Sequence, residues 1–229
     1  MRAFFRQLGW LLYKDLLVEW RARELLIATV LFSIIIVLLF SFAFLGGSPP
    51  TVEVMSGVLW VAVSFAGLLG VSRSFERERE ADTLAAVLLS PLPRSVLYVS
   101  KLVAITLLML LTASVVVPGL MLLFGLQIGP SWGLFMLLVL LGSVGFAAPA
   151  ALFGASLGQA RAREVLLPLL VYPLVVPALL AGARGTYAAL YATPESIGDA
   201  VRWLKFLFAF DCMAITLSTW LFPPLTTTD

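Results

Sequence analysis

Residues 102–160 form a stretch of 59 amino acids that contains no Asp, Glu, Lys or Arg. About 20 apolar residues are enough for a helix to cross the hydrocarbon core of a bilayer. The whole chain is similar in character, because 61% of its 229 residues are hydrophobic and 12% are charged, compared with about 45–50% and about 25% in soluble domains. The sequence therefore predicts an integral membrane protein and excludes a soluble enzyme.

Hydropathy, read against turn and charge signals, predicts an all-α membrane protein with a single transmembrane domain, residues 1–229. Six transmembrane helices are expected, at about residues 25–45, 54–72, 102–124, 134–157, 165–183 and 206–222. Residues 46–50 and 129–131 are rich in Gly, Ser and Pro, and they separate the first two helices and the third from the fourth. An even number of spans places both termini on one side of the membrane.

The basic residues predict which side this is. Twelve of the fifteen Lys and Arg residues lie in the amino-terminal segment or in the loops after the second and fourth spans. The other face has three: Arg184, Arg202 and Lys205. By the positive-inside rule, both termini are cytoplasmic. The net charge of +2 then reflects topology, and a nucleic-acid partner is not expected.

The amino-terminal segment, residues 1–24, is predicted to be amphipathic and cytoplasmic. A helix over residues 2–20 would have one apolar side, made of Phe4, Phe5, Leu8, Leu12 and Leu16. Its other side would be basic, with Arg2, Arg6 and Lys14. Such a helix can lie on the membrane surface. A simple extension of the first span explains the segment equally well.

The loop between the second and third spans, residues 73–101, is the most informative segment. Its first half is densely charged, and we expect it to continue the helix of the second span into water. Glu76 and Arg79, like Arg77 and Glu80, are opposite charges three residues apart, a spacing that stabilises a helix.

A second, short cytoplasmic helix is predicted in the same loop. Asp82 or Thr83 can cap it, and Pro91 and Pro93 end it. Its apolar face would consist of three residues at helical spacing, Leu84, Val87 and Leu88. The apolar run is too short to span a bilayer.

The apolar face of this short helix must be buried, either in the lipid interface or in a groove on a soluble partner. The acidic residues beside it, Glu76, Glu78, Glu80 and Asp82, disfavour the anionic cytoplasmic leaflet. A protein partner is therefore the preferred hypothesis, and a solvated loop packed on its own bundle is the alternative.

The sequence lacks residues and motifs that several kinds of catalysis and ligand binding require. It has no histidine, the commonest metal ligand and general base. It also has no P-loop, since none of its lysines, Lys14, Lys101 and Lys205, follows a glycine. We expect a non-catalytic chain that binds no metal or cofactor, with any ATP bound by a partner.

Asp211 is the single acidic residue inside a predicted span. We expect it near the outer interface, where it would face water or Lys205, and a polar contact inside the bundle is the alternative. The six tryptophans are attributed mainly to aromatic belts at the membrane interfaces. They are Trp10, Trp20, Trp60, Trp132, Trp203 and Trp220.

Two further patterns concern helix packing. Pro168, Pro173 and Pro177 fall within the fifth span and predict kinks, which fits a bundle that moves. Gly154 and Gly158 form a G-x-x-x-G pattern at the end of the fourth span. This pattern lets another helix approach closely, within one chain or between two copies.

Taken together, three stretches resemble a known family. They are residues 57–61, which read GVLWV, the loop from Phe75 through Arg94 to Lys101, and the triple-proline segment 166–177. With the six spans, they resemble the membrane subunits of ABC-2-type exporters and, among these, the CcmB family of the bacterial cytochrome c maturation system. The outer segment 184–205 is longer and more charged than is usual for that family.

The resemblance implies an inner-membrane permease subunit that couples ATP hydrolysis to haem export or to release of a haem-loaded chaperone at the periplasmic side. The partners it implies are a CcmA-like ATPase, CcmC-like and CcmD-like membrane proteins and the chaperone CcmE. The missing P-loop and the short capped helix further suggest that the loop couples the chain to this ATPase. Glu76, Arg77, Glu80 and Asp82 would register the contact, and Leu84, Val87 and Leu88 would be buried in it. Because histidine is absent, haem here could be ligated only by Met, Cys or Tyr. An ABC-2 permease for a lipid, drug or polysaccharide precursor is the alternative, and a scaffold without an ATPase is a third.

Overall fold

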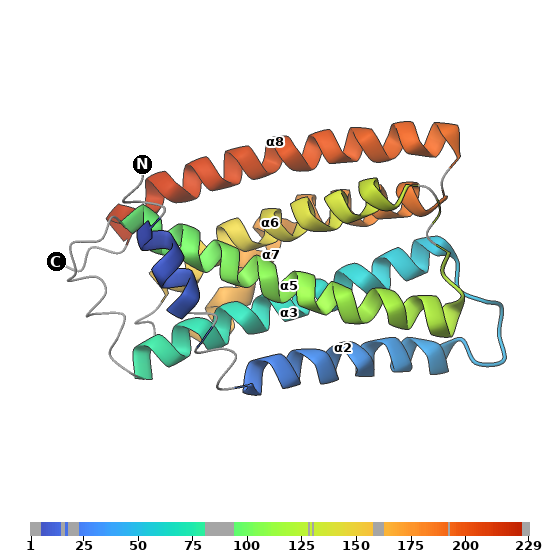
Figure 1. Ribbon diagram of the computed structural model, residues 1–229, viewed down its shortest axis with the longest axis horizontal. Helices are drawn as coiled ribbons and strands as arrows, with labels where there is room; N and C mark the ends of the chain where they lie inside the picture. The colour runs from blue at the N-terminus through green and yellow to red at the C-terminus, as the bar shows by residue number, and fades with distance from the viewer. Residues whose placement is uncertain are drawn as a thin grey trace.

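Six long α-helices make up most of the molecule (Figure 1). In the computed structural model the described residues are 6–14, 17, 23–80, 94–127, 129, 131–157, 163–191 and 193–225. The helices are α2 (Glu24–Ala43), α3 (Val52–Glu80), α5 (Arg94–Phe124), α6 (Trp132–Ser156), α7 (Arg163–Tyr191) and α8 (Pro194–Leu225). The described residues contain no β-strand.

The helices run alternately up and down along the long axis of the molecule. We call the end that holds the start of α2 and the end of α8 the proximal end, and the other end, with the turn between α7 and α8, the distal end. A separate helix over residues 6–14 lies at the proximal end, apart from α2 and at an angle to it (Figure 1). The simple-extension interpretation of the amino-terminal segment is therefore wrong. Arg23, with a left-handed φ of 53°, immediately precedes α2.

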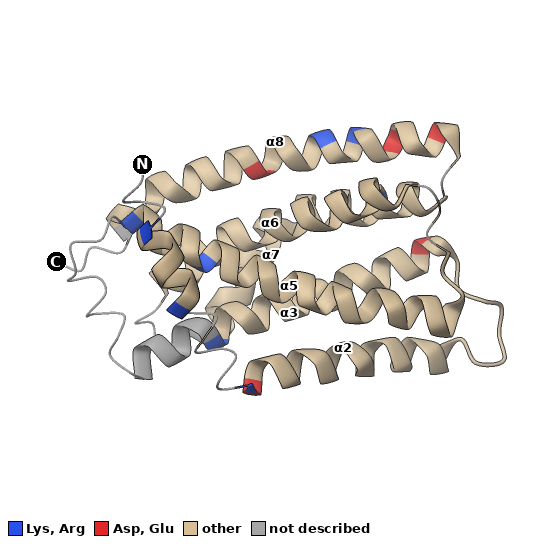
Figure 2. Cartoon of the chain, viewed as in Figure 1, with Lys and Arg blue, Asp and Glu red and all other residues tan. Residues whose placement is uncertain are grey.

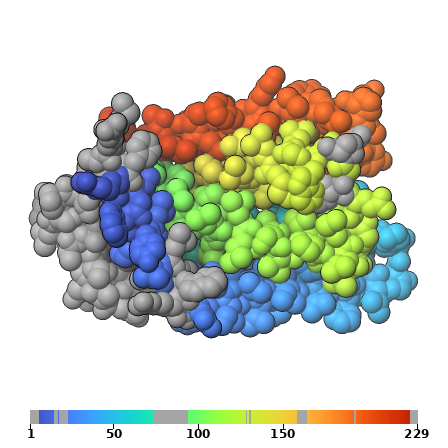
Figure 3. Space-filling view, viewed as in Figure 1, coloured from blue at the N-terminus to red at the C-terminus, as the bar shows by residue number. Residues whose placement is uncertain are grey.

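α3 and α6 form the centre of the bundle. In their apolar spans 67% of the residues are buried, compared with 28% in α2 and α8. α6 packs against α3, α5, α7 and α8, and Figure 3 shows α5 in the middle of one face, between α2 and α6. Several buried hydroxyls are satisfied within their own helices, as in Ser33 of α2, which donates to the Thr29 carbonyl at 2.7 Å.

The six-span prediction is confirmed, because all six helices are long and apolar enough to cross a membrane. Large apolar side chains cover their outward faces, for example Leu122 on α5, Leu169 on α7 and Trp220 on α8. Such a surface suits lipid, and the chain is a multi-pass membrane protein.

The helices extend beyond several predicted spans. α3 continues to Glu80, as expected from its charge pairs. Within the segment 184–205, α7 continues to Tyr191 and α8 begins at Pro194, so most of its described residues are helical. The fifth and sixth spans were predicted to stop at this segment because it is charged. The helices continue into it, since charged side chains are compatible with a helix that projects beyond the hydrocarbon core.

Candidate functional site

The predicted ATPase-coupling residues are only partly described. Glu76, Arg77 and Glu80 lie on the last two turns of α3, at the proximal end, and only their backbone is described. The remaining members of the set, Asp82, Thr83, Leu84, Val87, Leu88, Pro91 and Pro93, lie outside the described residues. The short helix and its apolar face therefore stay predictions.

Polar contacts join α5 to its neighbours next to this segment. Arg94, the first residue of α5, donates from Nη1 to the carbonyl of Pro223 at 2.7 Å, which places a cation at the negative end of the α8 dipole. One turn further, the Tyr98 hydroxyl donates to the Ala148 carbonyl at 3.2 Å, and its ring packs on Phe222. The start of α5 is thus fastened to α6 and α8.

Lys101 does not lie where the sequence predicted it. It was expected in the loop, but it lies inside α5 and its side chain is only 2% exposed. α5 begins at Arg94 rather than at residue 102, so the last eight residues of the predicted loop, 94–101, form its first two turns. The long aliphatic stem of a lysine can pack in such a place.

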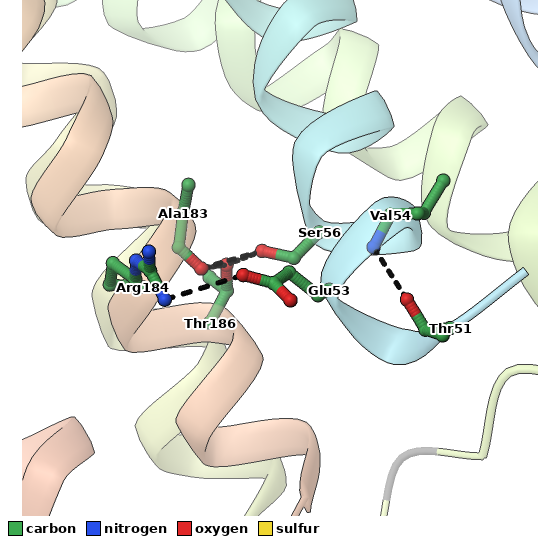
Figure 4. Close-up of polar contacts among 7 residues, drawn as sticks. All are labelled: Thr51, Glu53, Val54, Ser56, Ala183, Arg184 and Thr186. Carbon is green, nitrogen blue, oxygen red and sulfur yellow. Dashed lines mark hydrogen bonds and ion pairs between the residues drawn. The ribbon is translucent and has the colours of Figure 1, made fainter.

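At the distal end, side chains of α3 and α7 form a hydrogen-bonded cluster (Figure 4). Ser56 Oγ lies 2.6 Å from Thr186 Oγ1 and 2.7 Å from the Ala183 carbonyl, to which it donates. Thr186 in turn donates to the Gly182 carbonyl at 2.8 Å and accepts from Trp60 Nε1 at 3.1 Å. We call Ser56, Trp60, Ala183 and Thr186 the α3–α7 cluster.

An ion pair borders the α3–α7 cluster. Arg184 Nη1 lies 3.3 Å from Glu53 Oε1, and their side chains are 60% and 61% exposed (Figure 4). This pair also joins α3 to α7, but it does so in solvent. Arg202 and Asp199 form a second exposed ion pair within α8.

Trp60 occupies a notch between two glycines. Its ring lies so close to Gly142 of α6 and Gly182 of α7 that a Cβ atom at either position would overlap it. The side chain is 4% exposed, so the aromatic-belt prediction is wrong for Trp60. The two glycines leave space for the ring, because neither α6 nor α7 has a side chain at the point of contact. Three of the other tryptophans, Trp10, Trp132 and Trp220, are exposed.

Asp211 lies inside the bundle, and the expectation that it would face water or Lys205 is wrong. Its side chain is 4% exposed. A Cβ atom at Gly145 of α6 would lie 2.7 Å from Asp211 Oδ1 and 3.1 Å from the Cβ of Ala178 of α7. Asp211 therefore sits where α6, α7 and α8 meet, near the middle of α8.

Of the residues predicted to kink or pack helices, the structure describes the three prolines and one of the two glycines. Pro168, Pro173 and Pro177 lie within the continuous helix α7, and the last two are on its exposed face. Gly154 is buried in α6, and Gly158 lies outside the described residues. Kinks and pairing of two copies stay predictions. Across the described residues, no group of three or more His, Cys, Asp or Glu side chains could hold a metal ion.

The fold defines the class first: this is a six-helix, multi-pass membrane protein. The family model described as "CcmB protein" matches residues 6–225. "Heme exporter protein B" of Pseudomonas aeruginosa is 30% identical over 199 residues, which cover 86% of each chain. The chain belongs to the CcmB protein family, and the resemblance inferred from its sequence is confirmed.

Proposed function

We propose that this chain is the membrane-spanning permease subunit of an ABC transporter for cytochrome c maturation, and that the transporter exports haem or releases a haem-loaded chaperone at the periplasmic side. The observation that carries this proposal is the family match over residues 6–225, together with a relative of nearly the same extent that is named a haem exporter. The six apolar helices supply the membrane domain that such a subunit needs.

In this proposal the subunit is non-catalytic and lies in the bacterial inner membrane with the proximal end in the cytoplasm. Twelve of the fifteen basic residues belong to the segments at that end, as the positive-inside rule requires. Figure 2 shows basic residues gathered there and an acidic residue at the distal start of α3.

The proposed mechanism is mechanical. α3 is one uninterrupted helix of 29 residues, or about 43 Å at 1.5 Å per residue. It carries Glu76, Arg77 and Glu80 at its proximal end and Ser56 and Trp60 at its distal end. A partner ATPase that pushed on the proximal end would therefore displace a rod that is hydrogen-bonded to α7 at the other end. The apolar face of Leu84, Val87 and Leu88 would bind the ATPase.

The partners proposed are a CcmA-like ATPase, CcmC-like and CcmD-like membrane proteins and a CcmE-like chaperone. A pull-down of the tagged chain from native membranes in mild detergent, read by mass spectrometry and by haem absorbance, tests this set. Recovery of all these classes supports the proposal. Recovery of an ATPase without the others would instead favour an ABC-2 permease for a lipid, drug or polysaccharide precursor.

The coupling role is tested by the double variant Leu84→Asp/Leu88→Asp. We expect it to reach the membrane but to lose co-purification with the ATPase and ATP-dependent activity, because two charges would enter the proposed contact. The matched control is Leu45→Asp, at a leucine that is 75% exposed near the distal end. If the double variant behaves like this control, the loop does not bind the ATPase.

A further inference from the structure

Asp211 is a buried acid that the proposed mechanism does not use. It lies 17 residues after the start of α8 at Pro194 and 14 before its end at Leu225, which is about 25 Å and 21 Å along the helix. Neither carboxyl oxygen has a hydrogen-bond partner among the described residues. The acid is therefore enclosed near mid-helix without a polar contact.

The helices packed against Asp211 offer no charge to balance an anion. α6 contains no charged residue. In the middle of α7 the titratable group is Tyr172, whose ring contacts Phe146 of α6 edge-on. The charged residues of α7 are Arg163 and Glu164 at its start and Arg184, which is paired with Glu53 at the distal end.

The charged residues of α8 itself and of α5 likewise make no hydrogen bond with the Asp211 carboxyl. Arg202 and Lys205 are exposed, and Arg202 is paired with Asp199. Cys212, the neighbour of Asp211, is exposed as well. α5 meets α8 at the proximal end, through Tyr98 and Phe222, and its Lys101 makes no hydrogen bond with the Asp211 carboxyl.

An ionised carboxylate in such a place would lose its hydration without gaining a partner, and that is among the largest penalties in a protein interior. A neutral carboxylic acid avoids most of it. The small residues Gly145 and Ala178 let α8 approach closely, so water is excluded from the acid as long as the three helices remain packed.

We propose that Asp211 is a proton-binding site, and that its protonated form is the one that allows α8 to pack on α6 and α7 as observed. Separation of α8 from α6 and α7 at Asp211 would admit water, and the carboxyl oxygen would then release its proton to solvent. One proton per chain is then bound on closing and released on opening. This inference goes beyond the proposed function and does not depend on the cargo.

Infrared spectroscopy of the full-length chain in lipid nanodiscs tests the charge state directly. The wild-type spectrum at neutral pH minus that of Asp211→Asn should contain the carbonyl band of a protonated acid. The same subtraction with Asp199→Asn, which removes an exposed acid of the same helix, should contain carboxylate bands instead. Carboxylate bands in the Asp211→Asn difference would overturn the proposal.

Thermal unfolding as a function of pH tests the link to packing. A group that is neutral when folded and ionised when unfolded stabilises the fold at low pH and loses this effect as pH rises. Between pH 5.5 and 7.5 the wild-type midpoint should therefore fall, by on the order of 5 °C. Asp199→Asn should retain this dependence.

Asp211→Asn and Asp211→Leu, whose side chain branches at the same carbon, should both lack the pH dependence. Two variants guard against a folding failure in one of them. If both keep the wild-type dependence, Asp211 is not the group that binds the proton. If both unfold at every pH, a paired carboxylate is required and the proposal is wrong.

Discussion

The α3–α7 cluster and the Asp211 site are both polar regions inside an apolar bundle, and they differ in how their polar atoms are satisfied. In the cluster, Ser56, Trp60 and Thr186 are hydrogen-bonded across two helices. At the other site both oxygens of Asp211 lack a partner among the described residues. Polar groups that are hydrogen-bonded across helices resist separation of the helices. An unpaired acid, in contrast, gains hydrogen bonds when water reaches it.

The comparison indicates where the bundle is fixed and where it can open. α3 and α7 are joined by hydrogen bonds and by a tryptophan in a glycine notch. α8 is joined to α6 and α7 at Asp211 by close approach alone. Motion driven through α3 would therefore carry α7 with it. The helices would then separate where α8 contacts α6 and α7 at Asp211.

The largest effect is expected from Trp60→Ala. The ring fills the space between Gly142 and Gly182, and its removal leaves a cavity that neither glycine can fill. Truncation of a buried aromatic side chain costs about 3–5 kcal/mol, so the thermal midpoint in detergent should fall by on the order of 10 °C. Trp220→Ala, at a tryptophan that is 76% exposed, is the control. Equal shifts in the two variants would show that the notch does not fasten the helices.

The next largest effect is expected from Gly142→Ala. The added methyl group would overlap the Trp60 ring, which cannot move away because Gly182 lies against it. Overpacking of this kind costs about 1–3 kcal/mol, measured as a lower unfolding midpoint. Gly133→Ala, on the same helix, has nothing within 4 Å of the new Cβ and should leave stability unchanged or raise it. A neutral Gly142→Ala would contradict the observed position of the ring.

A smaller loss is expected from Thr186→Val, which keeps the shape but removes the acceptor of Trp60 Nε1 and the partner of Ser56. A buried donor left unpaired costs about 1–3 kcal/mol, and interhelical hydrogen bonds in membranes fall near the lower end. Thr112→Val is the control, because this buried threonine donates only to the Leu108 carbonyl of its own helix. Thr186→Ser should recover most of the loss. Equal effects of the two valine variants would mean that the cluster does not join the helices.

The sequence predicted the number of spans, the extension of α3 and the family, because these depend on local hydropathy, on charge spacing and on short motifs. It misplaced Trp60 and Asp211 for one shared reason. Each contacts glycines that are distant in sequence, Gly142, Gly182 and Gly145, and no local pattern reveals which helices pack together.

The error at Asp211 has a second cause. The last span was predicted to begin at residue 206, because Arg202 and Lys205 precede it, and this placed Asp211 near an interface. The helix in fact begins at Pro194. Glycines within apolar spans are the one signal that could have suggested close contacts, since a helix approaches another most closely where side chains are absent.

The smallest effect is expected from the ion pair between Glu53 and Arg184, which joins the same two helices as the α3–α7 cluster. Both side chains are about 60% exposed, and exposed pairs contribute about 0.2–1 kcal/mol. A double-mutant cycle with Glu53→Gln and Arg184→Gln should give a coupling free energy below about 0.5 kcal/mol that decreases further as salt is added. A coupling above about 2 kcal/mol would show that the pair is shielded from water, and a partner covering the distal end would be the physical explanation. In that case the ion pair and the hydrogen-bonded cluster would act as one joint, and the contrast between buried and exposed contacts at this end of α3 would no longer hold.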